Sequence, residues 1–240
     1  MIDLSSLNEN QRAAVLWDRG PLLVLAGPGS GKTRVLTYRI ARILEQSTGQ
    51  HFRVLALTFT NKAAAEMRSR VESLVPGELN RVRLTTFHSY AAELLQQHGS
   101  HLGIRPDFQI LSTDADREAL LDDVILKIQK ESAYSLPGHF RAAQLLPVVT
   151  QLLEKCVRTD DAEVWLQQRN VENAIPLARV YAAYREALRK TNALDFPSLI
   201  AGALELLTQY PILAKHIRKV YKHILVDEFQ DTNHSQYRIL

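Results

Sequence analysis

The sequence contains a single cysteine, Cys156, and no long apolar run. One cysteine cannot form an internal disulfide or a thiolate metal cluster, and such scarcity is typical of a reducing, cytosolic compartment. The first residues, MIDLSSLNENQ, lack the basic start and apolar core of a signal peptide. No apolar stretch approaches the ~20 residues that span a bilayer. We therefore expect a cytoplasmic protein without a membrane partner, in which Cys156 is a small buried hydrophobe.

The overall composition is that of an ordinary globular protein. The chain has 240 residues, of which 46% are hydrophobic and 23% charged. This length permits one large domain or two small ones with a sizeable core. The net charge is +3 and the pI is about 9.0. This mild basic excess permits a polyanionic partner without requiring one.

Two periodicities alternate in the first ninety residues. Short apolar runs of strand length lie at Pro21–Ala26, Arg53–Phe59 and Arg81–Phe87. Between them, the apolar spacing predicts helices at Lys32–Gln46 and Asn61–Leu74. Strands that alternate with helices in this way are typical of a parallel sheet with right-handed crossovers.

From about residue 90 to residue 188 the pattern becomes mostly helical. Apolar residues recur at helical spacing in 121–128 and again in 177–188, and both stripes are expected to be core. The segment YSLPGHF, Tyr134–Phe140, breaks this region, and only Phe108–Leu111 looks like a strand. The α/β pattern returns at Lys222–Thr232, where an apolar run leads into acidic residues.

The stretch LAGPGSGKT follows an apolar run and precedes a predicted helix, which is the context of a phosphate-binding loop. Backbone N–H groups of such a turn, together with the helix N-terminus, converge on a phosphate. We expect Lys32 to reach the β- and γ-phosphates and the Thr33 hydroxyl to ligate Mg²⁺. Taken alone, the match could be a flexible strand–helix turn, and the first glycine of the general pattern is replaced here. The expected loop comprises Ala26, Gly27, Pro28, Gly29, Ser30, Gly31, Lys32 and Thr33.

A second motif supports this interpretation. Asp227 and Glu228 follow the apolar run Ile224–Val226, so both acids are expected at the carboxyl end of a strand, where open α/β sheets place ligands. We assign Asp227 to the metal ion and Glu228 to polarising the attacking water. An isolated Asp-Glu pair is often two solvated acids, but that alternative is weaker in a chain that also carries a phosphate loop. Nearly two hundred residues separate the two motifs, which predicts a discontinuous ATPase core with a helical insertion.

These motifs together resemble the UvrD/Rep/PcrA-type DNA helicases of superfamily 1. The resemblance extends along nearly the whole chain. It rests on six segments in the order of that family: LNENQRAAV, AGPGSGKTRVLTYRI, LALTFTNKAAAEMRSRV, TTFHSYAAELL, LDFPSLI and ILVDEFQDTNHSQY.

The resemblance implies roles around the nucleotide. It matches Gln11 with the glutamine that reads adenine and Arg34 with a residue near the base. Asn8 with Gln11, or Ser6 with Glu9, could instead be a helix-capping pair, and both readings can hold together.

Further roles around the phosphates follow from the same resemblance. It gives Lys32, Thr33, Asp227 and Glu228 the roles inferred above and adds Gln230 as the residue that senses the γ-phosphate. The implied cofactors are ATP and Mg²⁺.

For DNA, the resemblance matches Phe59 and Phe196 with aromatics that stack on bases of the translocated single strand. Stacking tolerates any base, which suits a motor that moves along all sequences. Without the family, a core aromatic would be the preferred reading of Phe59, and His88 would be a structural histidine. Four further residues match polar positions of the strand-binding motifs: Thr58, Asn61, Thr86 and His88.

The resemblance implies an α/β fold, namely a RecA-like P-loop parallel sheet with an inserted, mostly α-helical subdomain. We expect the core at residues 1–90 and 190–240 and the insertion at 91–189. The sequence ends at QYRIL, and the family's next strand and second RecA-like core, which supplies arginines to the ATP site, do not follow.

The implied function is the N-terminal half of an ATP-dependent DNA helicase. It would move 3′ to 5′ on single-stranded DNA and at single-strand/duplex junctions, in repair or replication. The isolated chain is expected to be weakly active or inactive without the second core as its partner. Two alternatives remain open at this point: an ATP- and DNA-binding module that does not unwind, and the helicase part of a helicase–nuclease subunit.

Overall fold

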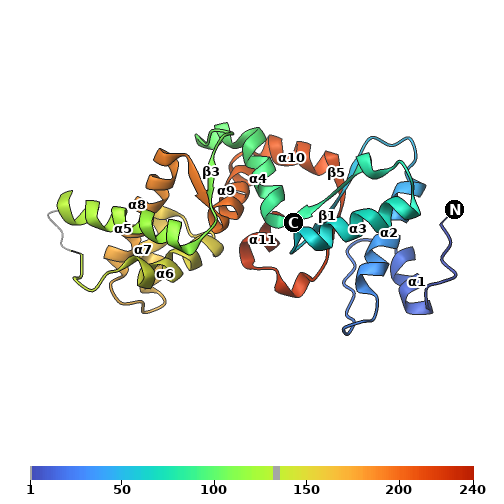
Figure 1. Cartoon of the computed structure of the whole chain (residues 1–240), viewed down its shortest axis with the longest axis horizontal. Coiled ribbons are helices and arrows are strands. Elements are labelled where there is room, and N and C mark those ends of the chain that lie inside the picture. The colour runs from blue at the N-terminus through green and yellow to red at the C-terminus, as the bar shows by residue number, and fades with distance from the viewer. Residues whose placement is uncertain (1, 132–135) are drawn as a thin grey trace. The chain divides into compact units, whose positions relative to one another are not determined.

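The computed structural model describes residues 2–131 and 136–240. The chain divides into two compact units, which are treated separately below (Figure 1). Unit 1 comprises Met1–Ser89 and Pro211–Thr232, and unit 2 comprises Tyr90–Tyr210 and Asn233–Leu240. The break expected at Tyr134–Phe140 lies partly outside the described residues.

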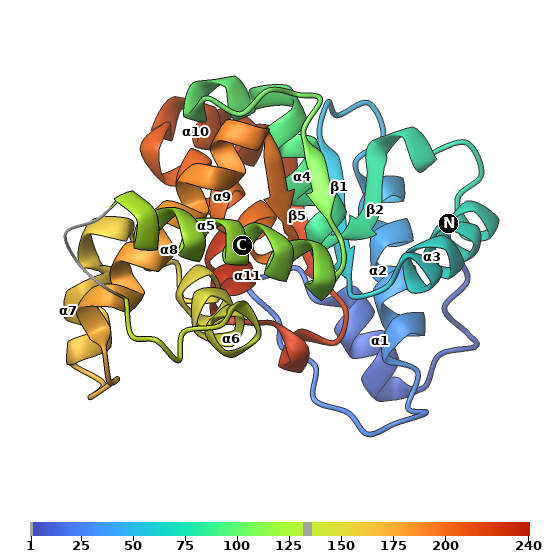
Figure 2. The ribbon, with the colours of Figure 1, turned by 60° about the vertical axis from the view of Figure 1, so that its left-hand side comes forward.

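A parallel sheet forms the centre of unit 1. Its described strands are β1 (Arg53–Thr58), β2 (Val82–Thr86) and β5 (Tyr221–Val226), in the order β2-β1-β5 (Figure 2). Both pairings of β1 are parallel, with Val54 opposite Val82 on one side and opposite His223 on the other. The mixed α/β fold with a parallel sheet, expected from the sequence, is confirmed.

Two helices pack on this sheet through their apolar faces. α2 (Lys32–Gln46) and α3 (Asn61–Leu74) coincide with the helices expected from periodicity. They share one core with β1 and β2. In β1, residues pointing to both faces are buried, as expected for a central parallel strand. α1 (Glu9–Leu16) packs against α2, and α10 (Pro211–Val220) packs against β5.

The strand predicted at Pro21–Ala26 is wrong. Residues 21–26, all of which the structure describes, form no strand, and their side chains are exposed. A strand needs a neighbour to pair its N–H and C=O groups. Within the described residues, β5 pairs only with β1, and its side chains are exposed or only partly buried. An apolar run of strand length is therefore not part of the sheet here.

Unit 2 is mostly helical, as the sequence predicts for this region. A short parallel pair, β3 (Gln109–Leu111) and β4 (Ala193–Asp195), accompanies the helices. α4 begins in the last residues of unit 1. The helices are α4 (Phe87–His98), α5 (Asp114–Glu131), α6 (Ala142–Glu154), α7 (Ala162–Gln167), α8 (Ala174–Thr191), α9 (Phe196–Gln209) and α11 (His234–Ile239).

The core of unit 2 is built on the stripes read from the sequence. Leu177, Tyr181, Tyr184 and Leu188 of α8 are buried together with residues of α5 and α6. Cys156 is half-buried rather than fully buried as expected. This partial burial raises the pKa of its thiol. In the described part of the chain, no helix is long and apolar enough to cross a membrane.

Candidate nucleotide site and DNA-contacting residues

The glycine-rich turn of unit 1 uses backbone conformations that only glycine adopts easily. Gly29 has φ +71° and Gly31 has φ +86°, both in the left-handed region. Gly31 is the residue before the first turn of α2, so the turn places the N-terminus of that helix at the loop. A Cβ atom on Gly31 would lie 2.8 Å from Nε2 of Gln11. A larger residue at position 31 would therefore strain the backbone and displace the Gln11 side chain.

The Lys32 amine lies over this turn. Its Nζ donates to the carbonyl oxygens of Ala26 (3.0 Å) and Gly27 (3.2 Å). The Ser30 hydroxyl also donates to Gly27 O at 2.7 Å. The positive charge is thus held at the loop by neutral acceptors, which a phosphate can replace with stronger, charge-assisted hydrogen bonds.

Gln11 connects helix α1 to the same loop. Its Oε1 accepts from Asn8 N–H and its backbone N–H donates to Asn8 Oδ1, so the two residues form a capping box. Its Nε2 donates to Ser30 O at 2.8 Å. The Asn8–Gln11 capping pair is confirmed, whereas the Ser6–Glu9 pair is not the cap. The same side chain reaches the phosphate loop, and its contact with adenine stays a prediction.

The two acids follow directly after β5. Asp227 is buried, and its backbone N–H donates to Leu57 O at 2.9 Å, which extends the pairing one residue beyond the strand. Burial is the main reason that the pKa of Asp227 is raised, and the neighbouring Glu228 charge adds to this. A hydrogen bond with Thr33 and the Lys32 charge act in the opposite direction. Thr33 therefore lies beside Asp227, and Lys32 is near enough for its charge to act on this carboxylate.

Glu228 adopts a left-handed backbone with φ +51°, which is unusual for a residue other than glycine. Its Oε2 accepts a 2.6 Å hydrogen bond from Nε2 of Gln230. This conformation turns the chain sharply after Asp227, so that the carboxylates of Asp227 and Glu228 occupy different positions. Backbone strain of this kind is concentrated at functional sites.

A cavity of about 770 Å³ is lined by the glycine-rich loop, the start of α2, Glu228 and Gln230. Arg34, whose guanidinium lies 5.6 Å from the centre of the Tyr38 ring, is at its wall. Arg70 of α3 also lines the cavity and was not anticipated, because a surface arginine on a helix has no local sequence signal. The lining residues are Val24, Leu25, Ala26, Pro28, Gly29, Gly31, Lys32, Thr33, Arg34, Arg70, Glu228 and Gln230.

Thr33, which lines this cavity, and the buried Asp227, which is hydrogen-bonded to Thr33, fit a magnesium–nucleotide complex. Thr33 supplies a hydroxyl oxygen and Asp227 a carboxylate, the hard oxygen donors that Mg²⁺ prefers. Within residues 2–131 and 136–240, no group of three or more His, Cys, Asp or Glu side chains could hold a metal by itself. Mg²⁺ needs only a few protein ligands when substrate phosphates complete its coordination shell.

The unit 1 residues expected at DNA lie at the carboxyl ends of β1 and β2. Thr58 and Thr86 are buried, and Thr86 Oγ1 accepts from the Ser89 N–H at the start of α4. The Phe59 ring lies 6.0 Å from that of Phe87.

Two further residues belong to this set. Asn61 is exposed at the start of α3, and burial lowers the pKa of His88. The structure brings these side chains to one end of the sheet, and their contact with DNA stays a prediction.

Phe196 belongs to unit 2, where it is the first residue of α9. It is 41% exposed, although it directly follows the fully buried strand β4. An exposed aromatic ring at the end of a buried strand is suited to stacking on a flat ligand.

Comparison with known proteins identifies the family of the chain. The model of the UvrD/REP helicase N-terminal domain matches residues 7–240. ATP-dependent DNA helicase PcrA of Staphylococcus epidermidis is 35% identical over 237 residues, which cover 99% of this chain and 31% of that protein. ATP-dependent DNA helicase UvrD1 of Mycobacterium tuberculosis is 37% identical over 238 residues, or 98% of this chain and 30% of that protein.

The chain therefore spans about three tenths of the length of these relatives. The matched region includes the glycine-rich loop, the acids after β5 and the segment around Phe196. With the family model covering nearly all of its residues, the chain belongs to the UvrD/REP helicase N-terminal domain family.

Proposed function

We propose that this chain is the N-terminal, ATP-binding part of a DNA helicase that moves 3′ to 5′ on single-stranded DNA and couples this movement to Mg-ATP hydrolysis. Repair or replication is the proposed setting, and single-strand/duplex junctions are the proposed substrates. The observation that carries the proposal is the proximity of Lys32, Thr33 and Asp227 beside a cavity large enough for a nucleotide.

The residues of unit 1 have distinct proposed tasks. The backbone N–H groups at the start of α2 and the Lys32 amine bind phosphate oxygens. Thr33 and Asp227 would hold Mg²⁺, which when bound neutralises charge on the β- and γ-phosphates. Glu228 accepts a proton from the attacking water, whose oxygen bonds to the γ-phosphorus while the bond from that phosphorus to the β–γ bridging oxygen breaks, so that ADP and inorganic phosphate leave. The hydrogen bond to Gln230 orients the Glu228 carboxylate for this step.

We further propose a RecA-like core formed by residues 1–90 and 190–240, with an inserted helical subdomain at 91–189. The division into a sheet-containing and a helical unit agrees with a discontinuous core, although residues 190–210 and 233–240 belong to the helical unit in this division. A second RecA-like core, which the resemblance to superfamily 1 helicases implies, would add arginines to the nucleotide cavity. Loss of such an arginine costs ~10³–10⁵ in rate, so this chain alone is proposed to hydrolyse ATP weakly.

ATP turnover tests the proposal directly. We would measure phosphate release and nucleotide binding with and without excess single-stranded DNA, for the chain and for Lys32→Ala. Lys215→Ala is a matched control, because Lys215 is an exposed lysine of α10 that does not line the cavity. Nucleotide binding that is lost in Lys32→Ala and retained in Lys215→Ala is the expected result. Equal binding by both variants would refute the nucleotide site.

One alternative has a specific observation in its favour. Because residues 21–26 are unpaired, the wall formed by Val24 and Leu25 lacks the support of a sheet. The 240 residues could then act as a module that binds ATP and DNA without hydrolysing ATP. Binding without turnover in either DNA condition would favour this module, whereas DNA-stimulated turnover would favour a working motor site.

A further inference from the structure

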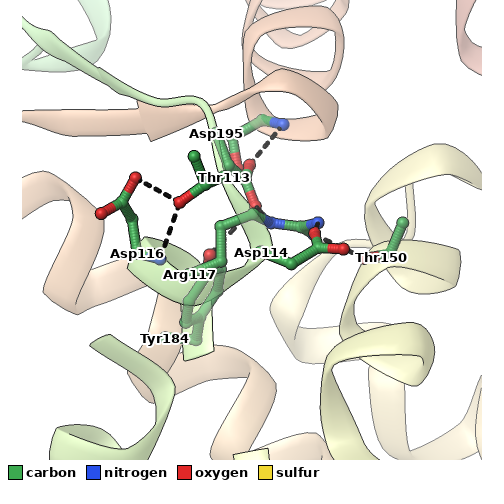
Figure 3. Close-up of polar contacts among 8 residues, drawn as sticks. Thr113, Asp114, Asp116, Arg117, Thr150, Tyr184 and Asp195 are labelled. Carbon is green, nitrogen blue, oxygen red and sulfur yellow. Dashed lines mark hydrogen bonds and ion pairs between the residues drawn. The ribbon is translucent and has the colours of Figure 1, made fainter. Parts of the chain in front are cut away.

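Asp195 is a fully buried carboxylate, 0% exposed, at the end of β4 and immediately before Phe196 (Figure 3). Its two oxygens have different partners. Oδ1 accepts from the Ser198 backbone N–H at 2.9 Å, which caps α9. Oδ2 accepts from Arg117 Nε and from the Tyr184 hydroxyl, both at 3.0 Å. One side chain thus sets the start of α9 and at the same time ties it to two other helices.

Arg117 extends the connection further through unit 2. Besides Asp195, its guanidinium donates to Asp114 Oδ1 at 2.9 Å and to Thr150 Oγ1 at 2.5 Å (Figure 3). The side chain comes from α5 and is only 11% exposed, Thr150 belongs to α6, and Tyr184 belongs to α8. Helices α5 and α8 therefore contact the carboxylate beside Phe196 directly, and α6 is connected to it through Arg117.

The electrostatics keep both Tyr184 and Arg117 protonated. Burial, followed by the Asp195 charge, raises the pKa of Tyr184, so its hydroxyl keeps the proton that it donates. Burial acts against the charge of Arg117, but Asp195 and Tyr184 outweigh it and leave the Arg117 pKa raised. Because each charge is paired and hydrogen-bonded, the cluster is well defined in geometry.

The cluster determines how Phe196 is presented. The capping bond fixes the backbone on either side of Phe196, and Pro197 restricts the first turn of α9 further. Every residue of β4 is buried, whereas the ring of Phe196 is exposed. A binding side chain keeps a productive position only when the residues behind it are locked, and here the locking groups are Asp195, Arg117 and Tyr184.

We propose that Arg117 and Tyr184 are positioning residues that act through Asp195 to hold Phe196 for stacking on a base of single-stranded DNA. They connect helices α5 and α8 to this contact. The inference rests on the proposed function, because it takes single-stranded DNA as the ligand of Phe196. Buried ion pairs can often be replaced by apolar side chains. If this pair had a purely structural role, its replacement would therefore change the stability of the chain and not its affinity for DNA.

A double-mutant cycle separates these roles. We would measure the affinity of the 240-residue chain for a fluorescent oligo-dT strand at fixed salt, by anisotropy, for Phe196→Ala, Arg117→Met and the double variant. Stacking on one aromatic accounts for about 5- to 150-fold in affinity, so Phe196→Ala is expected to weaken binding within that range. Arg117→Met is expected to weaken it several-fold in the native background and not at all in the Phe196→Ala background.

Arg185→Met is the matched control. Arg185 pairs with Glu205 at 2.8 Å in the same unit, and Glu205 lies on α9, ten residues after Asp195. Its loss is expected to leave DNA affinity unchanged. Tyr184→Phe removes only one hydroxyl and repeats the cycle if Arg117→Met fails to fold, which a melting curve would reveal. Nucleotide binding in unit 1 is measured in parallel for every variant.

The outcomes differ for the inference and for the proposed function. The positioning role would be overturned if Arg117→Met had no effect on affinity, or if the fold-losses of Arg117→Met and Phe196→Ala multiplied in the double variant. Either result would leave the helicase proposal intact. No effect of Phe196→Ala would remove the DNA role of Phe196 and the inference with it. No binding of oligo-dT by the unaltered chain, with or without nucleotide, would overturn the proposed DNA function itself.

Discussion

At the scale of single residues, Gly31 illustrates how conformation and space act together. Its left-handed backbone makes any side chain unfavourable by ~1–2 kcal/mol. Gly20 has a similar φ of +67° but open space around it, whereas a Cβ on Gly31 would collide with Gln11. Position 31 therefore carries a constraint that position 20 lacks, and that constraint concerns the nucleotide loop.

We predict that Gly31→Ala and Gly20→Ala each lower the free energy of unfolding by ~1–2 kcal/mol because of backbone strain. Only Gly31→Ala is expected to weaken nucleotide binding, since it displaces Gln11 from Ser30. Denaturant unfolding and nucleotide titration check this. Equal nucleotide affinity in the two variants would show that Gln11 does not support the loop.

His88 leads to a prediction about pH. Burial lowers its pKa below the ordinary value of 6.5, so the folded state disfavours the protonated form. At pH values above 6.5 both states are neutral and the group has no effect; as pH falls through 6.5, the unfolded state binds the proton first and stability is lost. We predict that His88→Gln loses less stability than the unaltered chain between pH 7.5 and 5.5. Melting curves at both pH values measure the difference, and parallel losses would contradict the prediction.

At the scale of elements, the segment 21–26 and strand β1 are similar apolar runs with different surroundings. Leu57 of β1 is 1% exposed, between two neighbouring strands, whereas Leu23 is 64% exposed. Truncating a buried leucine costs about 2–5 kcal/mol, while surface changes usually stay within about 0.5 kcal/mol. The same substitution therefore reports which of the two runs is packed.

We predict that Leu57→Ala lowers the free energy of unfolding by about 2–5 kcal/mol and that Leu23→Ala changes it by less than about 0.5 kcal/mol. Urea unfolding of the two variants measures both values. A large loss in Leu23→Ala would mean that residues 21–26 are packed in solution, contrary to the structure.

This contrast also shows what the sequence could predict. Helices α2 and α3 and strands β1 and β2 followed from local periodicity, because each buries its own stripe. The run at 21–26 could not be judged locally, since a strand depends on a partner elsewhere.

The same division holds for the site. The residues of the glycine-rich loop and the acids after β5 could be read from short motifs. Arg70 lies on a helix surface, and Arg117 and Asp195 meet across 78 residues, so no local pattern could reveal either contact.

At the scale of the whole molecule, the net charge of +3 suits a polyanionic ligand without dominating its binding. We predict that single-strand affinity falls with salt, with a log–log slope of about 0.7 for each phosphate contacted. Phe196→Ala is expected to lower the affinity at every salt concentration and to leave the slope unchanged, because stacking releases no counterions. Titrations from 50 to 200 mM salt test this, and a slope that changes in Phe196→Ala would indicate a role other than stacking.

The pairing of β1 with β5 has a consequence for synthesis of the chain. β1 is complete at Thr58, but its neighbour ends about 170 residues later at Val226. At ~5–20 residues per second, the ribosome needs on the order of 10–30 s to deliver that neighbour. During this interval one edge of β1 stays without its final partner, while most of the helical unit has already emerged. The nascent chain is then most exposed to wrong strand pairing, and Asp227 reaches the phosphate loop only when this interval ends.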